Sequence, residues 1–392
     1  MTSKWHEVPL RDLVGYISKG IAPSYADDET DTTIRVLNQK CNRNYQISYS
    51  ESRLHDTAKK KVPAERYVKR DDILINSTGA GTAGRIAQIG AVPCDTTVDG
   101  HMIILRANEK VMQRYLGYAL KAHQWEVLQL DEGSTGQTEL NRERLLDEIR
   151  ICYPESFSEQ EEIVLMLESI DHKTLVNKQI NDNLQQQAAA LFANFYDHAE
   201  TEVSFTEIIQ ILGGGTPKTG ESSYWNGNVP FFTPKDVGSP YTLSTEKTIT
   251  EEGLAHCNSR LYPVNTVFVT ARGTVGKVGL PGVPMAMNQS CYALVGKETH
   301  QLLVYFYTLK AVDRLKHKAS GAVFDAITTR DFESEIIMKL SDEDAQGFLD
   351  VAEPIYQAVL SNSIENLRLA ALRDSLLPKL MSGEIDVSDI QL

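Results

Sequence analysis

The sequence predicts an α+β protein in which two tandem globular domains are separated by two long helices that form an antiparallel coiled coil. Three observations support this fold class. The chain repeats itself, its excess of acidic residues is confined to two short segments, and those segments carry apolar residues every seven positions. Its 392 residues also exceed the roughly 250–300 at which a single hydrophobic core stops growing, so at least two cores are expected.

Charge separates the chain into four parts. Residues 158–202 contain 2 basic and 9 acidic side chains, and residues 341–392 contain 3 and 10. Residues 1–157 contain 21 and 22, and residues 203–340 contain 13 and 12. We therefore predict domains at 1–157 and 203–340, a central helix at 158–202, and a C-terminal helix and tail at 341–392. The net charge of −14 does not exclude a nucleic-acid partner, because the near-neutral domains can carry local basic patches.

The two predicted domains share a strand–glycine–strand pattern. Residues 71–87, DDILINSTGAGTAGRIA, and residues 265–279, NTVFVTARGTVGKVG, each read as an apolar strand, a glycine-rich loop and a second strand. Gly84-Arg85-Ile86 matches Gly276-Lys277-Val278, and the later strand Ile103-Ile104-Leu105 matches Tyr292-Ala293-Leu294. With predicted helices at 112–130 and 302–316, each domain reads as α+β.

The acidic segments repeat at a constant offset of 185 residues. Seven positions are identical in the two copies: Glu168, Ile170, Leu175, Asn177, Asn181, Leu184 and Leu191 match Glu353, Ile355, Leu360, Asn362, Asn366, Leu369 and Leu376. A heptad repeat of this length indicates a coiled coil. The predicted pairing positions are Ile170, Asn177, Leu184, Leu191, Ile355, Asn362, Leu369 and Leu376. The alternative is two separate surface helices, each packed on its own domain.

Capping residues and one proline set the expected helix limits. Ser158 with Glu161 has the spacing of a capping box at the start of the first helix, and Ser341 with Asp344 could act similarly in the second. Pro354 predicts a kink or a break early in the second helix.

Two asparagines interrupt the apolar stripes at matching places. Asn177 lies near the midpoint of a helix running roughly from Ser158 to Tyr196, and Asn362 near the midpoint of one from Ser341 to Leu380. Antiparallel pairing brings these midpoints together whatever the helix lengths. We therefore predict that the two amides hydrogen-bond to each other and fix the register, with the globular domains at opposite ends.

The second half of the chain resembles a known family. The segments Gly213-Gly214-Gly215-Thr216-Pro217-Lys218, Tyr224-Trp225-Asn226-Gly227-Asn228-Val229-Pro230-Phe231 and Thr233-Pro234-Lys235-Asp236 look like the opening of a target-recognition domain of a type I restriction–modification specificity subunit. Residues 376–385, LLPKLMSGEI, resemble the closing sequence of that family. The first domain has Gly20-Ile21-Ala22-Pro23-Ser24-Tyr25 instead of the signature.

The resemblance implies a non-catalytic DNA reader. Each of two target-recognition domains would read one half of a bipartite double-stranded DNA site, with the antiparallel helices setting the spacing. Two methyltransferase (modification) subunits would dock on the chain, and restriction/translocase subunits would join the full complex. S-adenosylmethionine, ATP and Mg would be bound by those partners, with no cofactor on this chain. The rival hypotheses are a DNA-independent coiled-coil scaffold and a specificity subunit of a related non-type-I system.

The sequence itself agrees with a chain that lacks this chemistry. It contains neither Asn-Pro-Pro-aromatic nor Asp-Pro-Pro-aromatic, nor a GxxxxGK[ST] phosphate loop. The Gly213–Gly215 run is interpreted as a tight turn and not as a phosphate cradle. Nine scattered histidines and five widely spaced cysteines predict no metal site and no disulfide framework, and the thiols are expected to be buried. No apolar run approaches the roughly 20 residues of a membrane span and the N-terminus lacks a signal sequence, so a cytoplasmic protein is expected.

DNA contact requires cations for phosphates and amides or guanidiniums for base edges. The candidates in the first domain are Arg43, Asn44, Lys60, Ser77, Thr78 and Arg85. Those in the second domain are Lys218, Lys235, Arg272, Lys277, Gln289 and Ser290. The glycine loops are included because glycine lets backbone amides approach a phosphate closely. Tyr224 and Trp225 are expected to pack within a loop and not to stack on bases.

Overall fold

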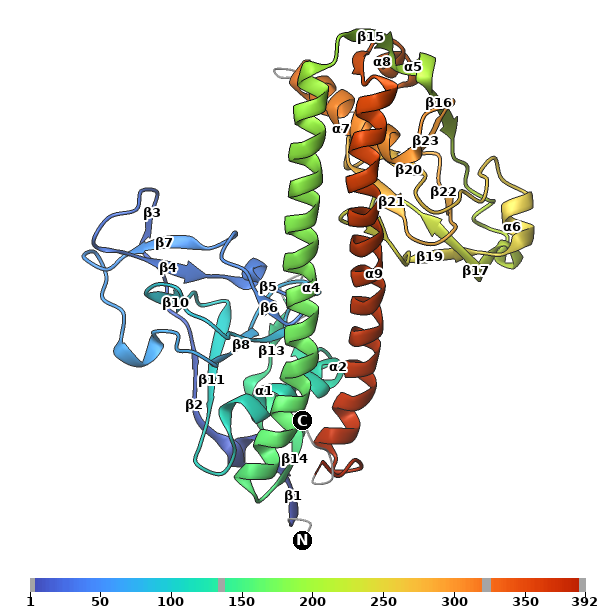
Figure 1. The fold of residues 1–392 in the computed structure, drawn as a ribbon. Helices are drawn as coiled ribbons and strands as arrows, with labels where there is room; N and C mark the ends of the chain where they lie inside the picture. The colour runs from blue at the N-terminus through green and yellow to red at the C-terminus, as the bar shows by residue number, and fades with distance from the viewer. Residues whose placement is uncertain (1–3, 133–137, 319–325, 388–392) are drawn as a thin grey trace. The chain divides into compact units, whose positions relative to one another are not determined.

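The computed structural model describes residues 4–132, 138–318 and 326–387. Its contacts divide the chain into two compact units (Figure 1). The first unit comprises Met1–His172 and Leu369–Leu392, and the second comprises Lys173–Arg368. Each unit therefore contains one globular domain together with a segment of both long helices.

The first unit is built on an antiparallel sheet in the order β2-β11-β8-β9. Its strands are β2 (Val14–Lys19), β8 (Ile73–Asn76), β9 (Ile86–Gln88) and β11 (Met102–Ala107). Every residue of β8 is buried, as expected for a short apolar run between turn residues. Helix α1 (Gln113–Ala122) packs on this sheet through Tyr115, Leu116 and Leu120, which belong to the same core as Ile73, Ile103 and Leu105.

A second sheet in this unit has the order β10-β4-β7-β3, with β10 parallel to β4. Its strands are β3 (Tyr25–Ala26), β4 (Thr33–Leu37), β7 (Arg53–Asp56) and β10 (Thr96–Val98). Two-stranded ribbons are formed by β1 (Trp5–Pro9) with β14 (Arg150–Pro154), β5 (Asn42–Arg43) with β6 (Gln46–Ile47), and β12 (Asp131–Glu132) with β13 (Glu139–Leu140). The remaining short α-helices are α2 (Gln124–Val127) and α3 (Arg142–Glu148).

The second unit repeats this plan with the sheet order β16-β23-β20-β21-β18. Its strands are β16 (Ile209–Gly213), β18 (Tyr241–Thr242), β20 (Val267–Thr270), β21 (Val278–Pro281) and β23 (Cys291–Gly296). Helix α7 (Gln301–Lys318) takes the place of α1 and buries ten of its residues. A smaller sheet has the order β19-β17-β22, and β15 pairs with β24. Bounds of the remaining elements are β15 (Thr201–Ser204), β17 (Trp225–Phe232), β19 (Lys247–Ile249), β22 (Ala286–Met287), β24 (Ile336–Lys339), α5 (Phe205–Ile208), α6 (Glu251–Ala255) and α8 (Thr329–Glu333).

Backbone hydrogen bonds confirm the predicted repeat. In the first unit Asn76 N–H donates to Arg85 O over 2.9 Å, and Gly84 N–H to Asn76 O over 2.8 Å. In the second unit Thr270 N–H donates to Lys277 O over 2.9 Å, and Gly276 N–H to Thr270 O over 2.8 Å. The glycine hairpins are therefore equivalent, and Arg85 corresponds to Lys277 as the sequence pattern predicted.

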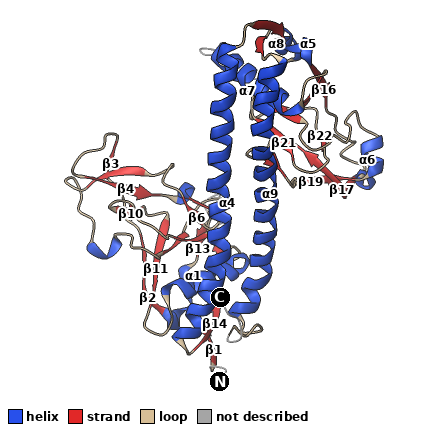
Figure 2. Ribbon diagram, in the orientation of Figure 1, coloured by secondary structure: helices blue, strands red, loops and turns tan. Residues whose placement is uncertain are grey.

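The two long helices are α4 (Phe157–His198) and α9 (Asp342–Met381), drawn as unbroken helices in Figure 2. They run antiparallel within each unit. In the first unit Asp171 Oδ1 lies 3.0 Å from Arg373 Nη1, and in the second Asn362 donates to Asn181 Oδ1 over 2.8 Å. The predicted antiparallel coiled coil is thus observed, and the alternative of two separate surface helices is excluded.

Burial along the helices follows the heptads unevenly. Ile170 and Asn177 are buried, while Leu184, Leu191, Ile355, Asn362, Leu369 and Leu376 are half-buried. The deepest positions in α9 are Phe348, Ala352, Val359 and Leu380. Phe348, Ala352 and Val359 share the second unit's core with α7, and Leu380 belongs to the first unit's core. Each helix therefore serves both the helix pair and a domain core.

Two details of the helix limits differ from the sequence predictions. The α4 cap is Ser156, whose Oγ accepts from Glu159 N–H over 3.4 Å, and Ser158 lies inside the helix. The cap of α9 is as predicted, since Ser341 Oγ accepts from Asp344 N–H over 3.1 Å. Pro354 does not break α9. Its side chain is exposed, so water can reach the Asp350 carbonyl that loses its intrahelical donor.

The central asparagines are bonded, but not to each other. Asn177 Nδ2 donates to Glu365 Oε2 over 2.7 Å and to Asn366 Oδ1 over 3.0 Å, and Asn362 Nδ2 donates to Asn181 Oδ1 over 2.8 Å. The predicted Asn177–Asn362 pair is therefore wrong by one helical turn. Because 177 and 362, and 181 and 366, are the repeat-related positions, the two observed asparagine pairs are related by the same internal symmetry.

The two observed asparagine pairs determine how leucine substitutions should affect the free energy of unfolding. Replacing Asn177 and Asn362 with leucine leaves the carbonyl oxygens of Asn366 and Asn181 without their donors. We expect the free energy of unfolding to fall by about 1–3 kcal/mol. Replacing all four asparagines removes both partners of the two asparagine–asparagine bonds, and Glu365, which Asn177 also contacts, keeps its ion pair with Lys173. Most of the lost stability should therefore return, because paired apolar replacement is close to neutral. Thermal unfolding of the two variants checks this, and a higher melting temperature for the double variant would contradict it.

The cysteines and the helix lengths can also be compared with the sequence predictions. All five cysteines are free, with Cys41 and Cys291 buried, as expected, and Cys94 exposed. Burial raises the pKa of the Cys291 thiol to about 12. None of the helices within the described ranges is long and apolar enough to cross a membrane.

Candidate nucleic-acid interface

In the second unit, three loops meet at the end of the sheet where β20 stops and β23 begins. Ala271 and Arg272 N–H both donate to Ser290 O, over 2.8 and 3.2 Å. Gly215 N–H donates to Met287 O over 3.1 Å, and Thr216 Oγ1 donates to Gln289 Oε1. The side chains of Arg272 and Gln289 are exposed. This edge, called the second strand-end patch, therefore presents a guanidinium, an amide and hydroxyl groups, the types that hydrogen-bond to base edges.

The equivalent edge of the first unit, where β8 ends and β11 begins, carries different side chains. Ser77 N–H donates to His101 O over 2.8 Å, as Ala271 does to Ser290, so Thr78 corresponds to Arg272 and His101 to Ser290. Thr78 Oγ1 and His101 Nδ1 lie 2.7 Å apart. The neighbouring Asp99 side chain accepts from His101 N–H over 2.9 Å, and burial raises the pKa of Asp99. Thr78 and His101 form the first strand-end patch, in which Asp99 shapes the turn.

A glycine at the start of each patch allows the loops to approach. A β-carbon on Gly214 would lie 2.1 Å from Asn288 O, and one on Gly20 would lie 2.1 Å from Val98 O. Gly20 therefore occupies the place of Gly214, although the first domain lacks the surrounding signature. The predicted tight turn is wrong, because Gly213 ends β16 and neither Gly214 nor Gly215 lies in a turn. The next helical element is a single 3-10 turn at Ser222–Tyr224, so no helix starts at the glycine run and the segment is a close backbone approach.

The other candidates in the first unit fall in different places. Ser77 is fully buried, and its hydroxyl points to Gly100 O, so its side chain cannot contact a base and the prediction for it is wrong. Lys60 Nζ donates to Ala22 O over 2.8 Å and holds the loop after Gly20. Arg43, Asn44 and Arg85 line one common groove.

In the second unit, Ser290 is half-buried and Lys218, Lys235 and Lys277 are exposed. Lys218 O accepts from Trp225 Nε1–H over 3.2 Å, and Tyr224 stacks on His256 with ring centroids 5.1 Å apart. Both aromatic residues pack within the loop, as predicted. Lys235 Nζ lies 3.7 Å from Glu246 Oε2, so its charge is partly offset.

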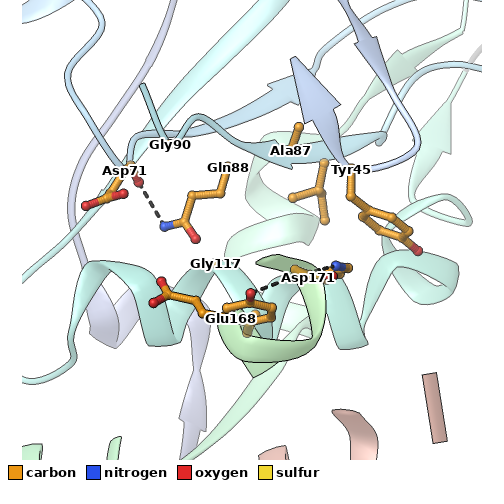
Figure 3. Close-up of a pocket in the computed structure, with 11 residues that line it drawn as sticks. Tyr45, Asp71, Ala87, Gln88, Gly90, Gly117, Glu168 and Asp171 are labelled. Carbon is orange, nitrogen blue, oxygen red and sulfur yellow. Dashed lines mark hydrogen bonds and ion pairs between the residues drawn. The ribbon is translucent and has the colours of Figure 1, made fainter. Parts of the chain in front are cut away.

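A further pocket in the first unit is lined by polar groups that bond to one another or to nearby backbone (Figure 3). Gln88 Nε2 donates to Asp71 O over 2.9 Å, and Tyr118 Oη–H donates to Asp171 Oδ2 over 2.9 Å. Lys121 Nζ is 3.5 Å from the same carboxylate, and burial lowers the pKa of Lys121. Since these side chains are paired with each other, we assign the pocket a structural role in joining α1 to α4.

Sequence reasoning missed three residues. Thr216 lay in the quoted family signature but was not selected, and only the fold shows its contact with Gln289. His101 was not among the predicted DNA contacts, yet its side chain lies on the patch with Thr78. Lys316 on α7 lies against Gly276 of the glycine hairpin, and no local sequence pattern links it to Lys277, which is 39 residues upstream. Among the described residues no cluster of three His, Cys, Asp or Glu side chains could hold a metal ion.

Comparisons with known proteins agree with this duplicated arrangement. The family model "Type I restriction modification DNA specificity domain" matches residues 2–186 and again residues 200–344. The chain is 31% identical over 124 residues to the type I restriction enzyme MjaIX specificity subunit of Methanocaldococcus jannaschii, covering 30% of this chain and 29% of the relative. It is 28% identical over 187 residues to the HindI specificity subunit of Haemophilus influenzae, covering 46% and 41%.

The curated alignments thus span less than half of either relative. Among solved structures, the S subunit of a type I restriction-modification system from M. genitalium superposes with a TM-score of 0.58 at 13% identity, covering 97% of this chain and 99% of that one. At this identity the likeness shows the fold, which is shared over nearly the full length of both chains.

Proposed function

Because the chain belongs to the type I restriction modification DNA specificity family, we propose that it reads a bipartite double-stranded DNA target as the specificity subunit of a type I restriction–modification complex. The two strand-end patches carry this proposal. They occupy the same place in two repeats of one fold but differ in chemistry, Thr78 and His101 in one and Thr216, Arg272 and Gln289 in the other. Two readers of this kind suit a target made of two half-sites.

The side chains on the patches suit reading in the major groove. A guanidinium binds guanine through O6 and N7, and an amide binds adenine through N6 and N7. Arg272 has no ion pair or side-chain hydrogen bond in the part of the chain that the structure describes, so it is free to take a partner. We propose Arg272 and Gln289 as base readers of one half-site, and Thr78 and His101 as readers of the other.

The chemistry is proposed to belong to partner subunits. This chain would be non-catalytic and hold no cofactor, while two methyltransferase subunits bind S-adenosylmethionine and restriction/translocase subunits use ATP and Mg. The long helices offer a surface for them, since Leu165, Leu175, Ile180, Val351, Leu367 and Leu372 are exposed. The complex would act in the cytoplasm.

Methylome sequencing tests the proposal. The chain is expressed with a type I methyltransferase subunit in a host free of adenine methylation. We expect methylated adenines within a single two-part motif whose halves are separated by unread base pairs. Co-purification of both proteins without methylation or sequence-selective DNA binding would instead favour the DNA-independent scaffold.

A further inference from the structure

A groove runs beside the glycine hairpin of the second unit, on the side away from Arg272. In the sheet order β23-β20-β21, Arg272 lies on the side of β20 that faces β23. Lys277 lies on the other side, directly before β21. The groove has a volume of about 500 Å³ and is lined by Lys277 and Lys316, with Gly276, Val312 and Asp313 between and beside them. It is therefore separate from the second strand-end patch.

Gly276 allows Lys316 to reach this groove. Its φ of +73° favours glycine, and a β-carbon there would lie 2.6 Å from Lys316 Cε. Both lysines are exposed, and neither has an ion pair among the described residues. Asp313, the acidic residue of the groove, lies 3.7 Å from His317 Nε2. The groove therefore carries two free cations and one carboxylate.

The first unit has an equivalent groove built by other means. Arg85, which corresponds to Lys277, lines it together with Arg43, and the groove has a volume of about 590 Å³ with no acidic residue in its lining. At Gly84, the counterpart of Gly276, a β-carbon would meet Val127 O at 2.9 Å. The α2 segment thus occupies the place of Lys316, and Arg43 on β5 supplies the second cation.

We propose that these two grooves bind DNA backbone phosphates, one in each unit, and that the strand-end patches alone read bases. The inference rests on the proposed function. A phosphate needs a nearby positive charge, which lysine and arginine both supply, whereas base reading depends on the arrangement of donors and acceptors. Each groove has two cationic side chains, which are lysines in the second unit and arginines in the first. The second cation comes from α7 in one unit and from β5 in the other. The patches differ in hydrogen-bonding chemistry.

Salt-dependent DNA binding separates the two roles. The complex with methyltransferase subunits is titrated with a duplex carrying its methylated motif and with a scrambled duplex, between roughly 50 and 200 mM salt. Lys277→Ala with Lys316→Ala should weaken binding to both duplexes equally. It should also reduce the slope of log affinity against log salt by about 1.8, or about 0.9 per lost phosphate contact. Lys277→Arg should keep the slope.

Lys297→Ala is the matched control, because Lys297 follows the opposite end of β23 and its Nζ donates to Thr206 O. An unchanged slope in the double lysine variant, or weakening confined to the motif duplex, would overturn the phosphate assignment. Failure of the proposed function is distinguishable from either result, because the unaltered complex would then yield no methylated motif or would bind the two duplexes alike.

Discussion

Replacing Gly214 with valine is expected to abolish base reading by the second unit while the first unit keeps its half-site. A β-carbon at this position would lie 2.1 Å from Asn288 O and 2.7 Å from Met287 O. Both obstacles are backbone atoms, so a loop must move. The segment that leads to Thr216 would then separate from the Gln289 loop. Since each base contact contributes about 1–3 kcal/mol, losing the patch should reduce discrimination at that half-site by more than about 100-fold.

The adjacent glycine supplies the control. A β-carbon on Gly213 meets no atom within 4 Å, so Gly213→Ala should leave both half-sites intact. Competition binding with duplexes mutated in one half-site or the other measures the effect. Equal losses in both half-sites after Gly214→Val would show that the patches do not act independently.

The second large effect concerns the core that joins α4 to the second domain. Phe192 on α4 is buried, and its ring centroid lies 4.9 Å from that of Phe306 on α7 and 5.3 Å from that of Phe348 on α9. We expect Phe192→Ala to lower the free energy of unfolding by about 3–5 kcal/mol, because it removes a large apolar side chain and leaves a cavity among three helices.

Calorimetry or denaturant unfolding measures this loss, which should appear in the transition of the second unit. Phe157→Ala is the control, since Phe157 begins the same helix and is 50% exposed. If both variants lose less than about 1 kcal/mol, α4 is not part of that core.

The sequence was most informative where structure is determined locally. The heptads predicted both long helices to within two residues of their ends, because helical periodicity is a property of consecutive residues. The glycine hairpins were found because Gly84 and Gly276 both adopt a positive φ that few other residues tolerate. These features needed no knowledge of which segments meet in the fold.

Contacts between distant segments were harder to predict. Asn177 was assigned the wrong partner because pairing by repeat position ignores the stagger between antiparallel helices, which places Asn366 opposite it. Ser77 was selected with the first glycine loop, but it follows a fully buried strand and is itself covered. Lys316 belongs to a site only because α7 packs beside the hairpin, a tertiary contact with no local signature.

The central claim is that two units read two half-sites independently. Methylome sequencing of the Arg272→Ala variant with its methyltransferase subunit tests it most directly. We expect one half of the methylated motif to lose specificity at one or two bases while the other half and the spacer length remain unchanged. Relaxed specificity in both halves together, or a motif identical to that of the unaltered chain, would contradict this account.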